Sequence, residues 1–145
     1  MLCLFSGAVH VFGTQTGDAG IQWFTYDEGM QRGKAQNKKV FLVFHADWCR
    51  YCLKMEKETF AKPTVIAYVN RNFIPISVNS DKQPDIAEKY KVRGLPMSWF
   101  LSETGEPIAN RPGYIAPDDM LKILKFFGTD SYRTMSYNAF LKKGK

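Results

Sequence analysis

The sequence predicts an α/β fold in which helices on both faces enclose a central mixed sheet of four to five strands. Three observations support this class. Residues 40–44 are apolar at every position, as expected for a strand buried on both faces of a parallel sheet. Strand-like and helix-like segments alternate before a hairpin signal and a last amphipathic helix. With 145 residues, 45% of them hydrophobic, the chain is long enough for one domain with a sizeable core.

The predicted elements follow one another with short connections. Asp27, Pro63 and Pro117 mark helix starts, because acidic side chains and proline suit the beginning of a helix. Gly128 ends the last long helix, and residues 103–106 have the composition of a hairpin turn. In chain order, strands are predicted over 21–26, 40–44, 73–78, 97–101 and 107–110, and helices over 27–37, from the cysteine pair to about 60, over 64–71, over 84–90 and over 117–128, the last with Met120, Leu121, Ile123, Leu124 and Phe127 as its buried face.

Charge is dispersed along the chain. Twenty Lys and Arg residues against 14 Asp and Glu residues give a formal net charge of +6. Basic residues that do not gather in one patch form a solvated surface, so we expect no nucleic-acid partner. There is no internal repeat and no low-complexity segment, and we expect a monomer.

Residues 1–20 differ in character from the rest. Residues 1–12 are mostly apolar, about the length of the apolar part of a signal peptide and too short to span a bilayer. No Lys or Arg precedes Arg32, so the charged start of a signal peptide is missing. We expect a signal-peptide remnant or a flexible arm over 1–20, export to the periplasm with the cytoplasm as the alternative, no stable membrane insertion, and no catalytic role for Cys3.

Two further parts follow this N-terminal stretch. Residues 21–128 are predicted to form the main domain, and residues 129–145 a C-terminal extension with a short helix after Ser136. The extension carries Tyr132, Tyr137 and Phe140. We expect these rings to pack on the domain, because aromatic residues are unusual in a disordered tail.

The chain is organised around Cys49 and Cys52. The first cysteine stands where the apolar strand 40–44 ends and a helix begins, so its sulfur lies at a helix N-terminus. Unpaired backbone N–H groups and the helix dipole favour the thiolate there, and Arg50 adds positive charge. The second cysteine lies on the same helical face, three residues on, where it can attack a mixed disulfide formed by the first. The pattern indicates a redox dithiol.

The residues around the pair argue against three other uses of it. A structural disulfide across so short a loop stabilises a fold by only about 2 kcal/mol. A structural zinc site needs four ligands, and only Cys3, His10 and His45 remain, without the spacing of a second pair. Covalent haem attachment requires histidine after the second cysteine, where Leu53 stands. We therefore expect no metal and no cofactor.

Residues 44–52, Phe-His-Ala-Asp-Trp-Cys-Arg-Tyr-Cys, resemble the active-site segment of the thioredoxin-like superfamily. Residues 90–96, ending in Leu95 and Pro96, resemble the segment that carries the cis-proline of that superfamily. The resemblance covers about 21–127 and implies a thioredoxin fold. Residues 20–23 and 132–136 are most similar to bacterial exported thioredoxin-like proteins of the thiol:disulfide interchange type.

The resemblance also implies a substrate-binding site. It places the Leu95-Pro96 bond in the cis form opposite Cys49, where the Leu95 backbone can pair with an extended substrate strand. Leucine departs here from the usual threonine of the family. Trp48, just before the first cysteine, would shield one side of the site and offer a flat apolar contact.

A second departure concerns proton transfer. Thioredoxins carry a buried acid six residues before the first cysteine, and this position is Val43 here. The lysine that pairs with that acid aligns with Ser77. The proton of Cys52 must therefore leave by another route, for which water, Glu56 and His45 are the candidates.

These observations together predict a thiol:disulfide oxidoreductase that reduces disulfides of other proteins through a mixed disulfide. The alternatives are an isomerase or oxidant, and a non-catalytic binding or chaperone module on the same fold. The expected partners are disulfide-containing proteins and an upstream thiol reductant or membrane electron donor.

Overall fold

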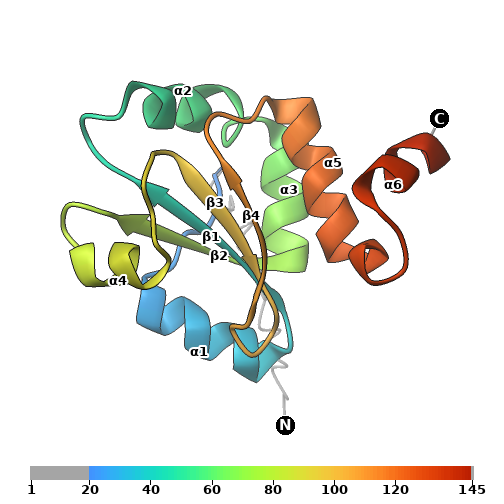
Figure 1. Ribbon diagram of the computed structural model, residues 1–145, viewed down its shortest axis with the longest axis horizontal. Coiled ribbons are helices and arrows are strands. Elements are labelled where there is room, and N and C mark those ends of the chain that lie inside the picture. Colours follow the sequence, from blue (N-terminus) through green and yellow to red (C-terminus); the bar gives the residue numbers. More distant parts are fainter. Residues whose placement is uncertain (1–19, 145) are drawn as a thin grey trace, which may run out of the picture.

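A computed structural model describes residues 20–144. Its elements are, in chain order, α1 (Tyr26–Gln36), β1 (Lys39–His45), α2 (Arg50–Glu58), α3 (Pro63–Asn72), β2 (Phe73–Asn79), α4 (Pro84–Lys89), β3 (Met97–Leu101), β4 (Pro107–Pro112), α5 (Pro117–Gly128), the short 3-10 helix η1 (Ser131–Arg133) and α6 (Tyr137–Lys143) (Figure 1). Cys3, His10 and the predicted signal segment lie outside the described residues.

The sheet has four strands in the order β2-β1-β3-β4. β1 and β2 are parallel, whereas β3 is antiparallel to both of its neighbours, so the sheet is mixed as the sequence predicts. Helices α2, α3 and α5 cover one face, and α1 and α4 lie on the other (Figure 1). β1 is therefore central and covered on both sides, which explains why its residues 40–44 are all apolar.

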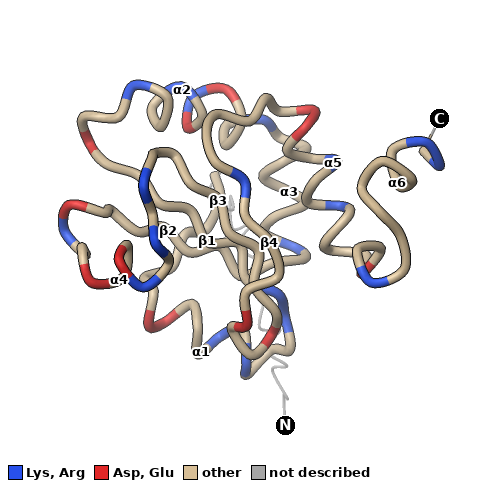
Figure 2. The backbone as a smooth tube through the Cα atoms, viewed as in Figure 1, with Lys and Arg blue, Asp and Glu red and all other residues tan. Residues whose placement is uncertain are grey.

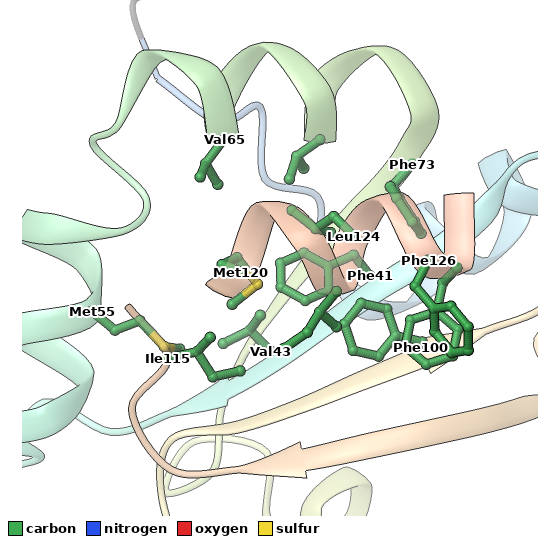
Figure 3. Close-up of a cluster of buried hydrophobic side chains, with 13 residues drawn as sticks. Phe41, Val43, Met55, Val65, Phe73, Phe100, Ile115, Met120, Leu124 and Phe126 are labelled. Atoms are coloured by element: carbon green, nitrogen blue, oxygen red, sulfur yellow. The ribbon is translucent and has the colours of Figure 1, made fainter. Parts of the chain in front are cut away.

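The two faces of β1 belong to two separate hydrophobic clusters. Phe41 and Val43 pack with residues of α2, α3 and α5, whereas Val40, Leu42 and Phe44 pack on the α1 and α4 side. Figure 3 shows the first cluster, in which Phe41 lies among Leu124, Phe100 and other side chains. Fully burying one such side chain contributes about 1.5–3 kcal/mol. The strand that leads into the cysteine pair is thus firmly held.

The predicted first strand over 21–26 is wrong. Only Phe24 pairs with β2, through a single parallel bridge to Ile76, and Tyr26 already belongs to α1. The reason is Pro75, which has no N–H to extend the ladder toward Gln22. The backbone N–H of Gln22 instead donates to the side-chain oxygen of Asn70, at 3.0 Å.

Two details of the helices also differ from the prediction. Thr25, not Asp27, caps α1, because its hydroxyl accepts from the N–H of Glu28 at 3.4 Å. On α5, Leu121 is only half-buried and Phe126 takes its place in the core. Phe126 is buried because the C-terminal extension covers it with two aromatic rings. The ring centroids of Tyr137 and Phe140 each lie 5.3 Å from that of Phe126.

A buried lysine joins the C-terminal extension to the sheet. The ammonium of Lys39, at the start of β1, lies 2.7 Å from Asp130 and 3.1 Å from Glu103. Hydrogen bonding to Lys39 lowers the pKa of Asp130. The pKa of Glu103 is also lowered, first by its own backbone N–H and then by Lys39. Both carboxylates are therefore held in their charged form beside the lysine.

Elsewhere the charges are spread over the surface. Figure 2 shows Lys and Arg distributed over the helices and loops together with Asp and Glu. Within residues 20–144, no helix is long and apolar enough to cross a membrane.

Candidate functional site

Cys49 and Cys52 form a disulfide at the N-terminus of α2, with their Cα atoms 5.2 Å apart. Cys49 is the N-cap residue of the helix, and its sulfur accepts a hydrogen bond from the N–H of Cys52 at 3.1 Å. No acidic residue occupies the first turn of α2. The first sulfur thus takes the place of a capping oxygen, where helix N–H groups stabilise negative charge. This geometry favours a thiolate at Cys49.

Both cysteines of the pair are buried in this oxidised state. Cys49 is 4% exposed and Cys52 is 8% exposed. Both belong to a small cluster with Ala46, and Leu95 packs against this cluster. Burial therefore does not distinguish the two sulfurs, whereas the capping bond does.

Leu95 and Pro96 lie beside the disulfide. The peptide bond between them is cis, the form that the resemblance implies. Leu95 packs on the disulfide cluster, and the carbonyl of Pro96 accepts from the N–H of Gly113 at 2.8 Å. Among residues 20–144, neither the N–H nor the C=O of Leu95 has a hydrogen-bond partner. That backbone is available to an incoming strand.

Large apolar side chains are exposed next to the pair. Trp48 is 71% exposed, Tyr51 59% and Leu53 45%. These three are the exposed large hydrophobic residues of the described chain, and all lie within a few positions of the cysteines. Exposed apolar side chains this close to the cysteine pair are candidates for contact with a substrate.

Cys52 lines a cavity of about 310 Å³. Val43 and Ser77 face each other there, since they are partners in the parallel register of β1 and β2. The two positions that hold the buried acid and its lysine partner in thioredoxins are therefore neighbours in space here, occupied by Val43 and Ser77. The cavity is lined by Trp23, Val43, His45, Ala46, Asp47, Cys52, Leu53, Met55, Glu56, Phe60, Ser77 and Pro96.

The predicted proton-transfer residues both reach this cavity. Glu56 stands four residues after Cys52 on α2, and His45 ends β1. Both line the same space as Cys52, so water in the cavity can connect a thiol to either side chain. Arg50, in contrast, is exposed on the first turn of α2, outside the cavity.

Asn79 and Asp81 contact the segment before the cysteines, which the sequence alone did not predict. Asp81 accepts a hydrogen bond from the indole N–H of Trp48 at 2.8 Å, and the amide of Asn79 donates to Asp47 at 3.1 Å. A signal for them exists in the sequence. Polar residues that follow two neighbouring parallel strands meet at the same edge of a sheet.

The far end of α2 is fastened to the loop before α5. The hydroxyl of Thr59, fully buried, donates to the carbonyl of Ile115 at 2.6 Å. The hydroxyl of Tyr114 donates to Glu58, and this bond raises the pKa of Tyr114. Among residues 20–144, no group of three or more metal-ligating side chains lies close enough together to hold a metal ion.

A closed Cys-x-x-Cys pair capping the helix that follows the central strand defines a thioredoxin-fold protein with a redox pair. The thioredoxin-like domain family matches residues 26–128, and the chain belongs to that family. Curated relatives include an uncharacterized protein of Caenorhabditis elegans, 33% identical over an alignment of 115 residues, which covers 73% of this chain and 16% of the relative. The thiol:disulfide interchange protein DsbD of Photorhabdus laumondii is 37% identical over an alignment of 75 residues, which covers 50% of this chain and 13% of that protein.

Solved structures agree on the fold. A thioredoxin from Thermus thermophilus superposes with a TM-score of 0.68 at 26% identity, over 74% of this chain and 87% of that one. A putative disulphide-isomerase from Bacteroides thetaiotaomicron gives a TM-score of 0.65 at 25% identity, over 77% of this chain and 95% of that one. The chain spans less than a fifth of the length of the curated relatives named above. A redox role of the Cys49–Cys52 pair is therefore supported by fold and by relatives.

Proposed function

We propose that this protein reduces disulfide bonds of other proteins through the Cys49–Cys52 dithiol. The observation that carries the proposal is the disulfide itself, whose first sulfur caps α2. Beside it lie exposed apolar side chains and the Leu95 backbone, which has no hydrogen-bond partner among residues 20–144. The relatives support it, because two of them are named for disulfide chemistry.

The reaction begins with the reduced pair. The Cys49 thiolate attacks one sulfur of the substrate disulfide, the substrate S–S bond breaks, and the departing sulfur takes a proton. The Cys52 thiol then loses its proton and attacks the Cys49 sulfur. The second substrate thiol leaves, the pair closes, and two electrons have passed to the substrate. An upstream thiol reductant or a membrane electron donor restores the dithiol.

Substrate docking uses the surface around the pair. The N–H and C=O of Leu95 would pair with an extended segment of the substrate, as in strand addition to a sheet edge. Trp48 would supply a flat apolar contact beside that segment. Both residues lie next to the disulfide, so the substrate sulfur is brought to Cys49.

Proton transfer uses the cavity. The helix N-terminus and Arg50 stabilise the Cys49 thiolate, whereas Cys52 must lose a proton when it attacks. Glu56 is our first candidate for the group that accepts this proton through water, and His45 is the second, since both share the cavity with Cys52.

Reduction of insulin disulfides tests the proposal. Wild type should reduce insulin with a dithiol as the electron source, Cys49→Ser should abolish the reaction, and Cys52→Ser should accumulate mixed disulfides with the substrate. Alkylation of the reduced protein at mildly acidic pH should label Cys49 before Cys52. A variant that carries both Cys49→Ser and Cys52→Ser is the inactive control. Wild type that reduces insulin no faster than this control would contradict the proposal and favour a binding or chaperone module.

We also propose that the protein acts in an exported, oxidising compartment such as the periplasm. The apolar stretch 1–12 and the similarity to an interchange protein support this location. Fractionation of cells that produce the full chain would test it, and recovery of the protein with the cytoplasmic fraction would contradict it.

A further inference from the structure

The loop between β2 and α4 is fastened to the turn that precedes the cysteines. Asn79 ends β2 opposite His45, and its amide nitrogen donates to the carboxylate of Asp47 at 3.1 Å. Two residues later, Asp81 accepts from the indole N–H of Trp48 at 2.8 Å. The backbone N–H of the residue between them donates to the carbonyl of His45, also at 2.8 Å. Three hydrogen bonds thus join this loop to residues 45–48.

Asn79 also gives the loop its shape. Its side-chain oxygen accepts from the N–H of Asp81 at 3.0 Å and of Lys82 at 3.3 Å. Its backbone carbonyl accepts from the N–H of Gln83 at 2.9 Å. Oxygen and nitrogen of the amide are therefore both engaged, one within the loop and one across to Asp47. This arrangement presents the carboxylate of Asp81 toward Trp48.

Packing alone does not explain how Trp48 is oriented. The ring is 71% exposed, and it belongs to none of the hydrophobic clusters of the protein. The bond from its N–H to the Asp81 carboxylate is charge-assisted and short, and such bonds fix geometry better than neutral ones. An exposed ring without it would exchange between rotamers on the nanosecond scale.

We propose that Asp81 and Asn79 are positioning residues that hold Trp48 in the orientation in which a substrate protein docks. The inference rests on the proposed function, since it assigns how the docking surface of the same site is kept in place. Neither residue lines the cavity at Cys52 or packs with the disulfide. Their loss should therefore weaken the binding of a large substrate, which covers Trp48, and leave the reaction at the sulfurs intact.

Two substrates of different size separate these effects. Insulin has a surface that can cover Trp48, whereas a small aromatic disulfide reagent meets only the pair. Asp81→Ala should raise the KM for insulin about three- to tenfold, in line with the loss of one partly exposed charge-assisted bond. The kcat for insulin and the rate with the small reagent should remain within twofold of wild type. Asp81→Asn keeps an oxygen acceptor and should restore most of the binding.

Asp85→Ala is the matched control, because it also removes one exposed carboxylate close by and leaves the Trp48 bond intact. In a Trp48→Ala background, Asp81→Ala should have no further effect on KM, since the two residues act through one contact. If Asp81→Ala equals Asp85→Ala, slows both substrates alike, or adds to Trp48→Ala, the positioning role is wrong while the proposed function stands. If wild type reduces neither substrate, the proposed function fails and the positioning role fails with it.

Discussion

Val43→Asp would place a carboxyl beneath Cys52, and its consequences can be worked out from the structure. Val43 is 4% exposed, packs in the cluster between β1 and α5, and faces Ser77 across the parallel strands. The substitution loses about 1.5–3 kcal/mol of apolar burial. A buried carboxyl with only a hydroxyl and cavity water as partners costs about 1–3 kcal/mol more. The total of about 2.5–6 kcal/mol corresponds to a fall in Tm of about 8–20 °C for a chain of this size.

The loss of stability in Val43→Asp should depend on pH. Burial raises the pKa of the introduced carboxyl above its value of about 4 in the unfolded chain. Between these two values the folded state binds more protons than the unfolded state, so stability falls as pH rises. The variant should therefore be closer to wild type at pH 5 than at pH 8, by about 1 kcal/mol. Urea unfolding at the two pH values measures this difference.

The same substitution tests the proton route. Without an acid at Val43, wild type should form the mixed disulfide quickly and resolve it slowly near neutral pH. Val43→Asp combined with Ser77→Lys should recover part of the lost stability, because the new charges face each other, and it should speed resolution in stopped-flow turnover. If wild type already resolves as fast as the double variant, the missing acid is irrelevant, and Glu56→Gln becomes the decisive variant. If Val43→Asp destabilises the protein equally at pH 5 and pH 8, the argument that burial raises the pKa of the introduced carboxyl is refuted.

Two further predictions concern the framework. Lys39→Met should lower the free energy of unfolding by about 1–2 kcal/mol at pH 7, less than the loss of a fully buried ion pair, because Asp130 is half exposed. The pKa values of Asp130 and Glu103 are lowered in the folded state, so the stabilisation by their ion pairs with Lys39 is lost as pH falls through about 4 and below. The destabilisation by Lys39→Met should therefore be smaller at pH 3, as measured by urea unfolding. Thr59→Val should leave the buried carbonyl of Ile115 without its donor and lower stability by about 1–3 kcal/mol, measured as a lower urea midpoint at unchanged slope. If Lys39→Met destabilises the protein as much at pH 3 as at pH 7, the ion pairs do not stabilise the fold in this way. If Thr59→Val leaves the urea midpoint unchanged, the same holds for the hydrogen bond to Ile115.

Much of the fold follows from sequence, because local signals and global packing agree along most of this chain. The uninterrupted apolar run at β1 predicts a strand covered on both faces, and prolines predict the starts of α3, α4 and α5. The failure at residues 21–26 has a local cause. A strand needs a partner that can donate along its whole length, and Pro75 removes the donor that the first strand would need.

The site is predictable to the extent that it is local in sequence. The cysteine spacing places a sulfur at a helix N-terminus, and the structure adds that this sulfur caps the helix. The packing of Leu95 against the cysteine pair joins positions more than forty residues apart, and no local pattern predicts it. The same holds for Asp81, whose role appears only when the ends of β1 and β2 meet. Long-range side-chain contacts are the part that sequence patterns leave open.

The central claim is that the Cys49–Cys52 pair works as a reductant, and its reduction potential tests this claim most directly. Equilibration with glutathione or dithiothreitol buffers, followed by alkylation of free thiols, gives the fraction of reduced pair at each ratio. We predict a potential at or below about −230 mV, at the reducing end of the range for Cys-x-x-Cys proteins. A value near about −120 mV would mean that the pair oxidises its partners, and the proposed direction of electron flow would be wrong.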